Sequence, residues 1–183
     1  MKKLCLVIFL LFLLVPVVNA KVTQLGIGGF GGLNMPIVQD DQANGSIFGF
    51  KARVKVMSFL IAEPHVMFGK WGKPDPVDGV ELGIDGSKLT SFGVDALIGS
   101  MPGNSKFRPY GLVGAGIYKI KNDDTGYDES KLGFSFGTGF GIGITPLLDL
   151  DFGGKLIIAP QEEGSKKALL VTGGLLYYFN FGQ

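Results

Sequence analysis

The chain has 183 residues, the length of a single domain, and its net charge is only +1. A nearly neutral chain without a basic stripe is not typical of a nucleic-acid-binding protein, so no nucleic-acid partner is expected. The 30 glycines follow no Gly-X-Y period and lie among Phe, Ile, Val and Leu, which excludes collagen and argues against low-complexity disorder.

The first 20 residues have the pattern of a secretory signal peptide. Lys2 and Lys3 form a short positive region, residues 4–18 are almost entirely apolar, and small residues then precede a cleavage site after Ala20. The apolar run is shorter than the roughly 20 residues that a spanning helix needs. We therefore predict a cleaved signal at residues 1–20 and one mature domain at residues 21–183. The single cysteine, Cys5, lies in the signal, so the mature domain has neither a disulfide nor a catalytic thiol.

Alternation with a period of two dominates the mature domain, and this pattern predicts β-strands. Eight segments show it, at residues 22–33, 47–57, 59–69, 87–99, 107–120, 131–144, 148–159 and 168–181. Short connections alternate with longer polar linkers, which lie at residues 34–46, 70–86, 121–130 and 160–167. Short turns at one end and long loops at the other are typical of an all-β, eight-stranded, up-and-down antiparallel barrel.

The first segment contains GIGGFG, from Gly26 to Gly31, which matches the dinucleotide-binding pattern G-x-G-x-x-G. That pattern works only between a hydrophobic strand and a helix, because the helix N-terminus holds the phosphates. Only a short strand start precedes these glycines, and residues 33–36 (LNMP) follow them. We therefore expect no nucleotide and no other cofactor.

The sixth segment, KLGFSFGTGFGIGITP (residues 131–146), shows the alternation most strictly. One face carries Phe, Ile, Leu and Thr, and the other carries glycine, serine and one lysine. Segments two, four, seven and eight divide in a similar way. The interior of an eight-stranded barrel is only wide enough for side chains to fill it, so the bulky faces cannot all point inward. They are predicted to face lipid, with the small and charged residues lining the lumen.

Aromatic residues near the segment ends suit the girdles that transmembrane barrels carry at both membrane interfaces. The predicted girdle residues are Phe68, Trp71, Phe107, Tyr110, Tyr118, Tyr177 and Phe179. Segments one and five have glycine on both faces, so the direction of Arg108 stays open.

These features resemble the small eight-stranded outer-membrane β-barrel proteins of the OmpA/OmpX type. The stretches that carry the resemblance are LGIGGFGG (25–32), FLIAEPHVMFG (59–69), RPYGLVGAGIY (108–118) and LLYYFNF (175–181). The resemblance implies a bacterial outer-membrane location, with both termini in the periplasm and four loops outside. It also implies contact with outer-membrane lipid and lipopolysaccharide. Insertion by the barrel-assembly machinery would read the alternating aromatics of the last strand, here Tyr177, Phe179 and Phe181.

Charged residues on the predicted lumen faces are expected to pair with one another, because a buried charge without a partner is very costly. The predicted network comprises Lys51, Arg53, Lys55, Glu63, His65, Asp95, Asp149, Asp151 and Lys155. A paired network would plug a narrow lumen. The alternative is a narrow pore for ions or small solutes with charged walls.

His65 is the only histidine, and it shares a face with Glu63. With Ser58 or Ser91 as the nucleophile, this pair could support hydrolysis, and some small outer-membrane barrels modify lipid A with such residues. The deacylase pairing of His and Ser two residues apart is absent, because Val66 and Met67 follow His65. A single histidine also argues against zinc. We therefore expect no enzyme, with lipid A modification as the alternative.

The linkers 70–86 and 121–130 are acidic and form a candidate surface for an extracellular partner. Neither has the D-x-D-x-D-G spacing of a calcium loop. The sequence thus predicts a structural or surface-interaction role, with a plugged lumen.

Overall fold

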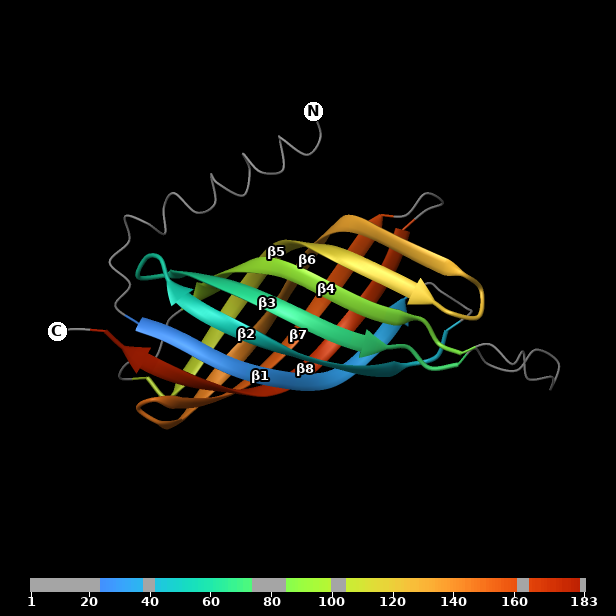
Figure 1. Ribbon diagram of the computed structural model, residues 1–183. Coiled ribbons are helices and arrows are strands. Elements are labelled where there is room, and N and C mark those ends of the chain that lie inside the picture. The colour runs from blue at the N-terminus through green and yellow to red at the C-terminus, as the bar shows by residue number, and fades with distance from the viewer. Residues whose placement is uncertain (1–23, 38–41, 74–84, 100–104, 161–164, 182–183) are drawn as a thin grey trace, which may run out of the picture.

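The protein forms one closed barrel of eight antiparallel strands, in which β8 pairs back onto β1 (Figure 1). The structure is a computed structural model and describes residues 24–37, 42–73, 85–99, 105–160 and 165–181. The strands are β1 (Gln24–Ile37), β2 (Gly45–Lys55), β3 (Leu60–Lys70), β4 (Lys88–Gly99), β5 (Phe107–Asn122), β6 (Tyr127–Thr145), β7 (Leu148–Pro160) and β8 (Ser165–Asn180). The predicted all-β up-and-down barrel is confirmed.

The described part of the chain contains no helix long and apolar enough to cross a membrane. The predicted signal peptide, residues 1–20, lies outside the described residues.

Strands β5 and β6 are longer than predicted and form a hairpin beyond the rest of the rim, at the end opposite the start of β1 and the end of β8 (Figure 1). Their pairing continues from Phe107 and Ile142 to Asn122 and Tyr127. The predicted linker 121–130 is therefore mostly strand, with a turn at residues 123–126. Gly126 has a φ of 70°, a conformation that glycine adopts without steric cost. The apolar alternation ends before this hairpin does, because its outward face carries Lys119, Lys121 and Asp128 in place of apolar residues.

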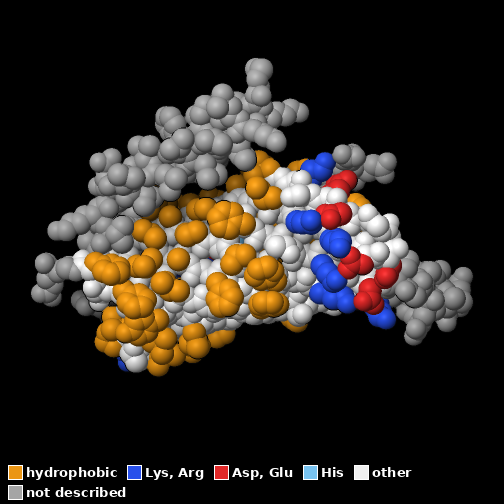
Figure 2. Space-filling model, viewed as in Figure 1, with side chains coloured by type: hydrophobic (Ala, Val, Ile, Leu, Met, Phe, Trp, Pro, Cys, Tyr) orange, Lys and Arg blue, Asp and Glu red, His pale blue; other side chains and the backbone are white. Residues whose placement is uncertain are grey.

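The outer wall carries the bulky apolar side chains, as predicted. Along β2, Phe48 and Phe50 are 58% and 62% exposed, whereas Lys51 and Arg53 are buried in the lumen. Figure 2 shows the apolar side chains over the wall nearer the short turns, and a belt of lysines and carboxylates at the long-loop end. The barrel is thus apolar on its outer wall and holds charged residues in its lumen, the reverse of the placement in a soluble barrel.

The glycine face of β6 lies inside and makes room for large side chains of β5. A Cβ at Gly139 would overlap the hydroxyl of Tyr110, and a Cβ at Gly133 would lie 2.8 Å from the ring of Tyr118. A Cβ at Gly143 would lie 3.3 Å from the guanidinium of Arg108. The strict alternation of β6 is therefore explained by lipid on one side and by these three side chains on the other.

The girdle prediction is wrong for three residues. Trp71, Tyr110 and Tyr118 are buried inside the barrel, at 3%, 8% and 0% exposure. The reason for the two tyrosines is strand parity: they share the inward face of β5 with Arg108, opposite the glycines of β6. The remaining predicted girdle residues are exposed on the outer wall, namely Phe68, Phe107, Tyr177 and Phe179.

Candidate functional site in the lumen

The lumen contains charged side chains between two apolar clusters. One cluster lies toward the long loops and includes Met67, Trp71, Tyr118 and Leu170. The other lies toward the short turns and includes Ile61, Leu97, Tyr110, Leu112, Leu176 and Tyr178. On β3 the order is visible along one strand, because Ile61 is followed on the inward face by Glu63, His65 and Met67. Charged groups in the middle of the barrel are thereby shielded from water at both ends.

Lys51 and Arg53 of β2 meet two carboxylates from β3 and β7. Lys51 Nζ donates to Asp151 Oδ2 at 2.5 Å and lies 3.7 Å from Glu63 Oε2. Arg53 Nε donates to Glu63 Oε2 at 2.5 Å, and its Nη2 lies 2.9 Å from Asp151 Oδ1. Tyr110 donates its hydroxyl proton to Asp151 at 3.1 Å, and its ring lies 4.7 Å from the Arg53 guanidinium. Two cations and two anions thus share four contacts across the lumen.

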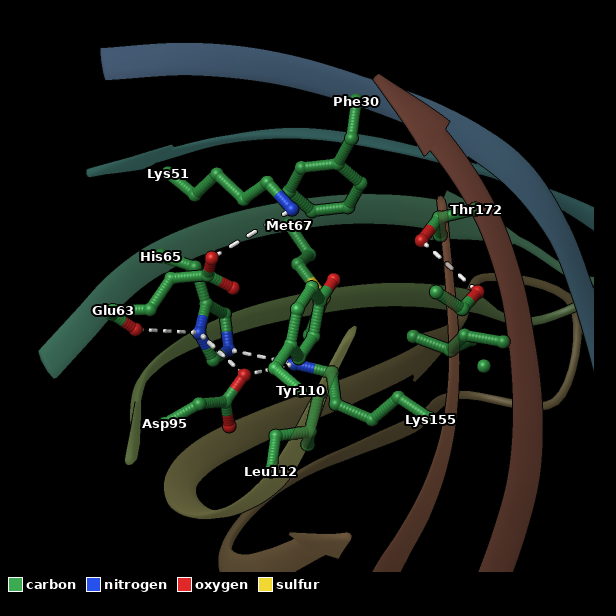
Figure 3. Close-up of a pocket in the computed structure, with 13 residues that line it drawn as sticks. Phe30, Lys51, Glu63, His65, Met67, Asp95, Tyr110, Leu112, Lys155 and Thr172 are labelled. Atoms are coloured by element: carbon green, nitrogen blue, oxygen red, sulfur yellow. Dashed lines mark hydrogen bonds and ion pairs between the residues drawn. The ribbon is translucent and has the colours of Figure 1, made fainter. Parts of the chain in front are cut away.

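Asp95 of β4 is the centre of a second group. Its Oδ2 accepts from Lys155 Nζ at 2.7 Å, and its Oδ1 accepts from Ser135 Oγ at 2.9 Å. His65 Nδ1 lies 3.4 Å from the same carboxylate, and His65 Nε2 lies 3.5 Å from Lys155 Nζ. Figure 3 shows His65 and Lys155 converging on Asp95 from different sides of the barrel. Gly114 permits this arrangement, because a Cβ at this position would overlap the carboxylate of Asp95.

A separate ion pair joins Arg108 of β5 to Asp149 of β7. Arg108 also donates to the backbone oxygen of Ser105 at 2.5 Å. Arg108 therefore points into the lumen, which settles the direction that the sequence left open. Lys55, a predicted member of the network, is half-buried near the end of β2 and has no ion pair among the described residues.

The charges in these pairs balance. The cations are Lys51, Arg53, Arg108 and Lys155, and the anions are Glu63, Asp95, Asp149 and Asp151. All the carboxylates are at least 93% buried. Removing one partner from a buried pair costs about 3–5 kcal/mol, because the other charge stays buried without compensation. The pairing therefore fixes which charged side chains fill the lumen.

A small cavity of about 30 Å³ lies between the two charged groups, lined by Lys51, Glu63, His65, Asp95 and Lys155 among others (Figure 3). This volume holds only one or two water molecules. A substrate of ordinary size does not fit this cavity.

The residues considered for hydrolysis are not arranged as a catalytic triad. Ser58 lies at the short turn between β2 and β3, away from His65. Ser91 is buried beside Met67 in the strand register, and its hydroxyl has no hydrogen-bond partner in the described structure. The serine that joins the His65 group is Ser135, and it bonds to Asp95 instead of the imidazole. The described residues contain no group of three His, Cys, Asp or Glu suited to a metal ion.

A closed eight-stranded barrel with an apolar outer wall and ion pairs in its lumen has the architecture of a transmembrane barrel. The family model described as "Outer membrane protein beta-barrel domain" matches residues 7–179, and the chain belongs to this family. The protein is therefore a bacterial outer-membrane barrel, as the resemblance in the sequence implied.

Solved structures of small outer-membrane barrels are similar to the chain. Neisserial surface protein A has a TM-score of 0.66 at 17% identity, covering 86% of this chain and 97% of its own. The N-terminal barrel domain of OprF from Pseudomonas aeruginosa has a TM-score of 0.56 at 18% identity, covering 86% and 98%. Ail, the attachment invasion locus protein of Yersinia pestis, has a TM-score of 0.55 at 16% identity, covering 86% and 99%. No curated protein sequence matches the chain. Identities this low support the fold alone.

Proposed function

We propose that the protein is a closed outer-membrane barrel with a structural or surface-interaction role, and that its lumen is plugged by charged residues and does not transport solutes. The observation that carries this proposal is the layer of balanced ion pairs across the lumen, in which Lys51 and Arg53 pair with Asp151 and Glu63, and Lys155 pairs with Asp95. A solute crossing the barrel would have to separate these pairs and leave charges unpaired in a buried site. The apolar clusters on both sides of the layer add a further barrier.

Planar-bilayer recording tests the plug directly. The wild-type barrel is expected to give no stable unitary conductance. The matched variant replaces Lys51, Arg53, Glu63 and Asp151 together by serine, which keeps the lumen neutral and removes bulk. This variant is expected to conduct, which shows that the recording can detect an opened barrel. Stable unitary conductance of the wild type would support the alternative function, a narrow pore for ions or small solutes.

The surface role is proposed for the long-loop end. Lys70, Lys88 and Lys121 lie opposite one another on three neighbouring strands, just beyond the apolar wall. Like charges in direct register are unfavourable, and phosphate groups at this level would relieve the repulsion. Asp85 pairs with Lys70, and Asp123 pairs with both Lys88 and Lys121, so the lysines outnumber their carboxylate partners at this rim. These features support lipopolysaccharide as the lipid partner.

An extracellular partner is proposed for the loops 70–86 and 121–130. Most of the first loop lies outside the described residues, whereas the second is the tip of the β5–β6 hairpin. Because this hairpin extends beyond the rim, its tip is well placed for contact with another surface. Pull-down with the intact barrel and with a variant shortened at residues 123–126 would measure how much the hairpin tip contributes to binding of an extracellular partner.

Export and assembly complete the proposal. The signal peptide is proposed to be cleaved after Ala20, and the barrel-assembly machinery to read the last strand at Tyr177, Phe179 and Phe181. N-terminal sequencing of the membrane-inserted protein should begin at Lys21. A mature protein that still begins at Met1 would contradict the cleavage.

Lipid A modification receives less support, because His65 is 4% exposed inside the barrel and its neighbours are Asp95 and Lys155. Mass analysis of lipid A from cells with and without the protein tests this alternative. We expect the same acyl pattern in both. A changed pattern that His65→Ala abolishes would establish an enzyme.

A further inference from the structure

The outer wall is not evenly covered by bulky side chains. A hollow of about 420 Å³ lies on the lipid-facing surface of β5–β8 and extends from Phe107, at the short-turn end of β5, to Val171 in β8. Its walls are formed by Phe107, Pro109, Thr138, Phe140, Phe152 and Val171. Its volume is within the range of small-molecule pockets, about 300–1,000 Å³.

One glycine that lines this hollow, Gly154, is not explained by packing inside the barrel. A Cβ at the inward Gly139 would overlap Tyr110, whereas a Cβ at the outward Gly154 would meet no atom within 4 Å. Gly154 lies beside Thr138 on one side and Val171 on the other, at the floor of the hollow. A larger residue would fit there, so the small residue keeps open a space that the fold itself does not need.

The hollow offers shape and apolar contact, and no charge. No charged side chain lines it. Its two hydroxyls are already engaged: Thr138 donates to the backbone oxygen of Tyr110 at 2.9 Å, and Thr172 donates to that of Gly153 at 3.4 Å. One side is a row of aromatic rings, in which Phe140 lies 5.4 Å from Phe107 and 5.5 Å from Phe152 between ring centroids. An empty space beside such a row would lose the dispersion contacts of its lining, so an apolar occupant is favoured.

We propose that this hollow holds one acyl chain of a phospholipid from the leaflet on the short-turn side. The hollow is continuous with the apolar wall that faces lipid, so acyl chains are the molecules that reach it. A flexible chain can lie along the row of rings that ends at the exposed Phe107 and Phe152. The rigid wall of a second barrel would meet those rings first and leave the hollow unfilled. The proposal does not depend on whether the lumen conducts.

Native mass spectrometry of the detergent-purified barrel, with phosphatidylethanolamine as the probe, tests the proposal. The wild type is expected to retain one lipid per barrel at activation energies that remove all others. Gly154→Phe fills the hollow, and the lipid-bound fraction should fall about tenfold, with a smaller fall for Gly154→Leu. Ala96→Phe is the matched control, because Ala96 is a small outward residue on β4, and retention should be unchanged.

Folding of each variant is checked by its urea midpoint, and Gly154→Leu keeps the test valid should the larger side chain disturb folding. Equal retention by the wild type and both Gly154 variants would overturn the proposal. A wild-type dimer without retained lipid that Gly154→Phe converts to monomer would also overturn it, in favour of a second copy as the occupant.

Discussion

The lumen and the long-loop rim contain ion pairs of the same length in very different surroundings. Lys51 and Asp151 meet at 2.5 Å with side chains that are 7% and 2% exposed. Lys121 and Asp123 also meet at 2.5 Å, but both side chains are 48% exposed. A buried pair cannot be broken cheaply, because each charge has lost its water, whereas water and salt replace the partner of an exposed pair. Distance alone therefore does not tell which ion pairs maintain the barrel.

The largest effect is expected from breaking the lumen network at one point. Asp151→Ala removes the carboxylate shared by Lys51 and Arg53 and leaves two buried cations with Glu63 alone. We expect a loss of about 3–5 kcal/mol in the free energy of unfolding, measured by urea titration in lipid vesicles. Asp123→Ala is the matched control at the rim and should lower the unfolding midpoint far less, because exposed ion pairs contribute little. Equal midpoints for the two variants would contradict the distinction.

A smaller loss is expected from crowding the lumen without removing a charge. Gly139→Ala places a Cβ against the hydroxyl of Tyr110, which itself donates to Asp151. Overpacking of this kind costs about 1–3 kcal/mol. Gly111→Ala on the outer wall is the control, because its Cβ would meet nothing within 4 Å. The same urea titration should show a lower midpoint for Gly139→Ala only.

The smallest effect is expected from acid at the rim. Hydrogen bonds from Lys121 and Lys88 hold the pKa of Asp123 at about 2, below the usual value near 3.9. Because the pKa of Asp123 is lower in the folded state than in the unfolded state, its carboxylate stabilises the fold. This contribution to the free energy of unfolding is complete above about pH 4 and is lost as the pH falls toward 2. Carbon NMR of the labelled carboxyl should show this titration. The double variant with Lys121→Gln and Lys88→Gln should move the pH midpoint of the Asp123 titration upward. An unchanged pH midpoint would show that the two lysines do not pair with Asp123 in solution.

Alternation along single strands predicted much of the candidate site. The inward direction of Lys51, Arg53, Glu63 and Asp95 follows from parity with small neighbours and with buried residues on the same strand. Which carboxylate meets which cation could not be predicted, since this depends on the stagger between strands as the barrel closes. Lys51 and Asp151, for instance, come from β2 and β7.

The residues that the sequence missed lie where the alternation is weak. Arg108 and Tyr110 share β5 with glycines on both faces, such as Gly111 and Gly114, so hydrophobicity gives no direction there. The glycines of the sixth segment indicated only that this face of the strand leaves space inside the barrel. That the space belongs to Tyr110, Tyr118 and Arg108 required the register of β5 against β6.

The closure of the barrel between β1 and β8 links the order of synthesis to the balance of charge. Strand β1 is made first, yet its outer edge pairs only with β8, which is made last. Lys51 and Arg53 emerge 100 and 98 residues before their partner Asp151. Until the final strands arrive, the chain therefore carries both an open sheet edge and cations that await an anion. The missing anion arrives with β7 and the closing edge with β8, so a chain truncated before β7 has both uncompensated lumen cations and an open sheet edge.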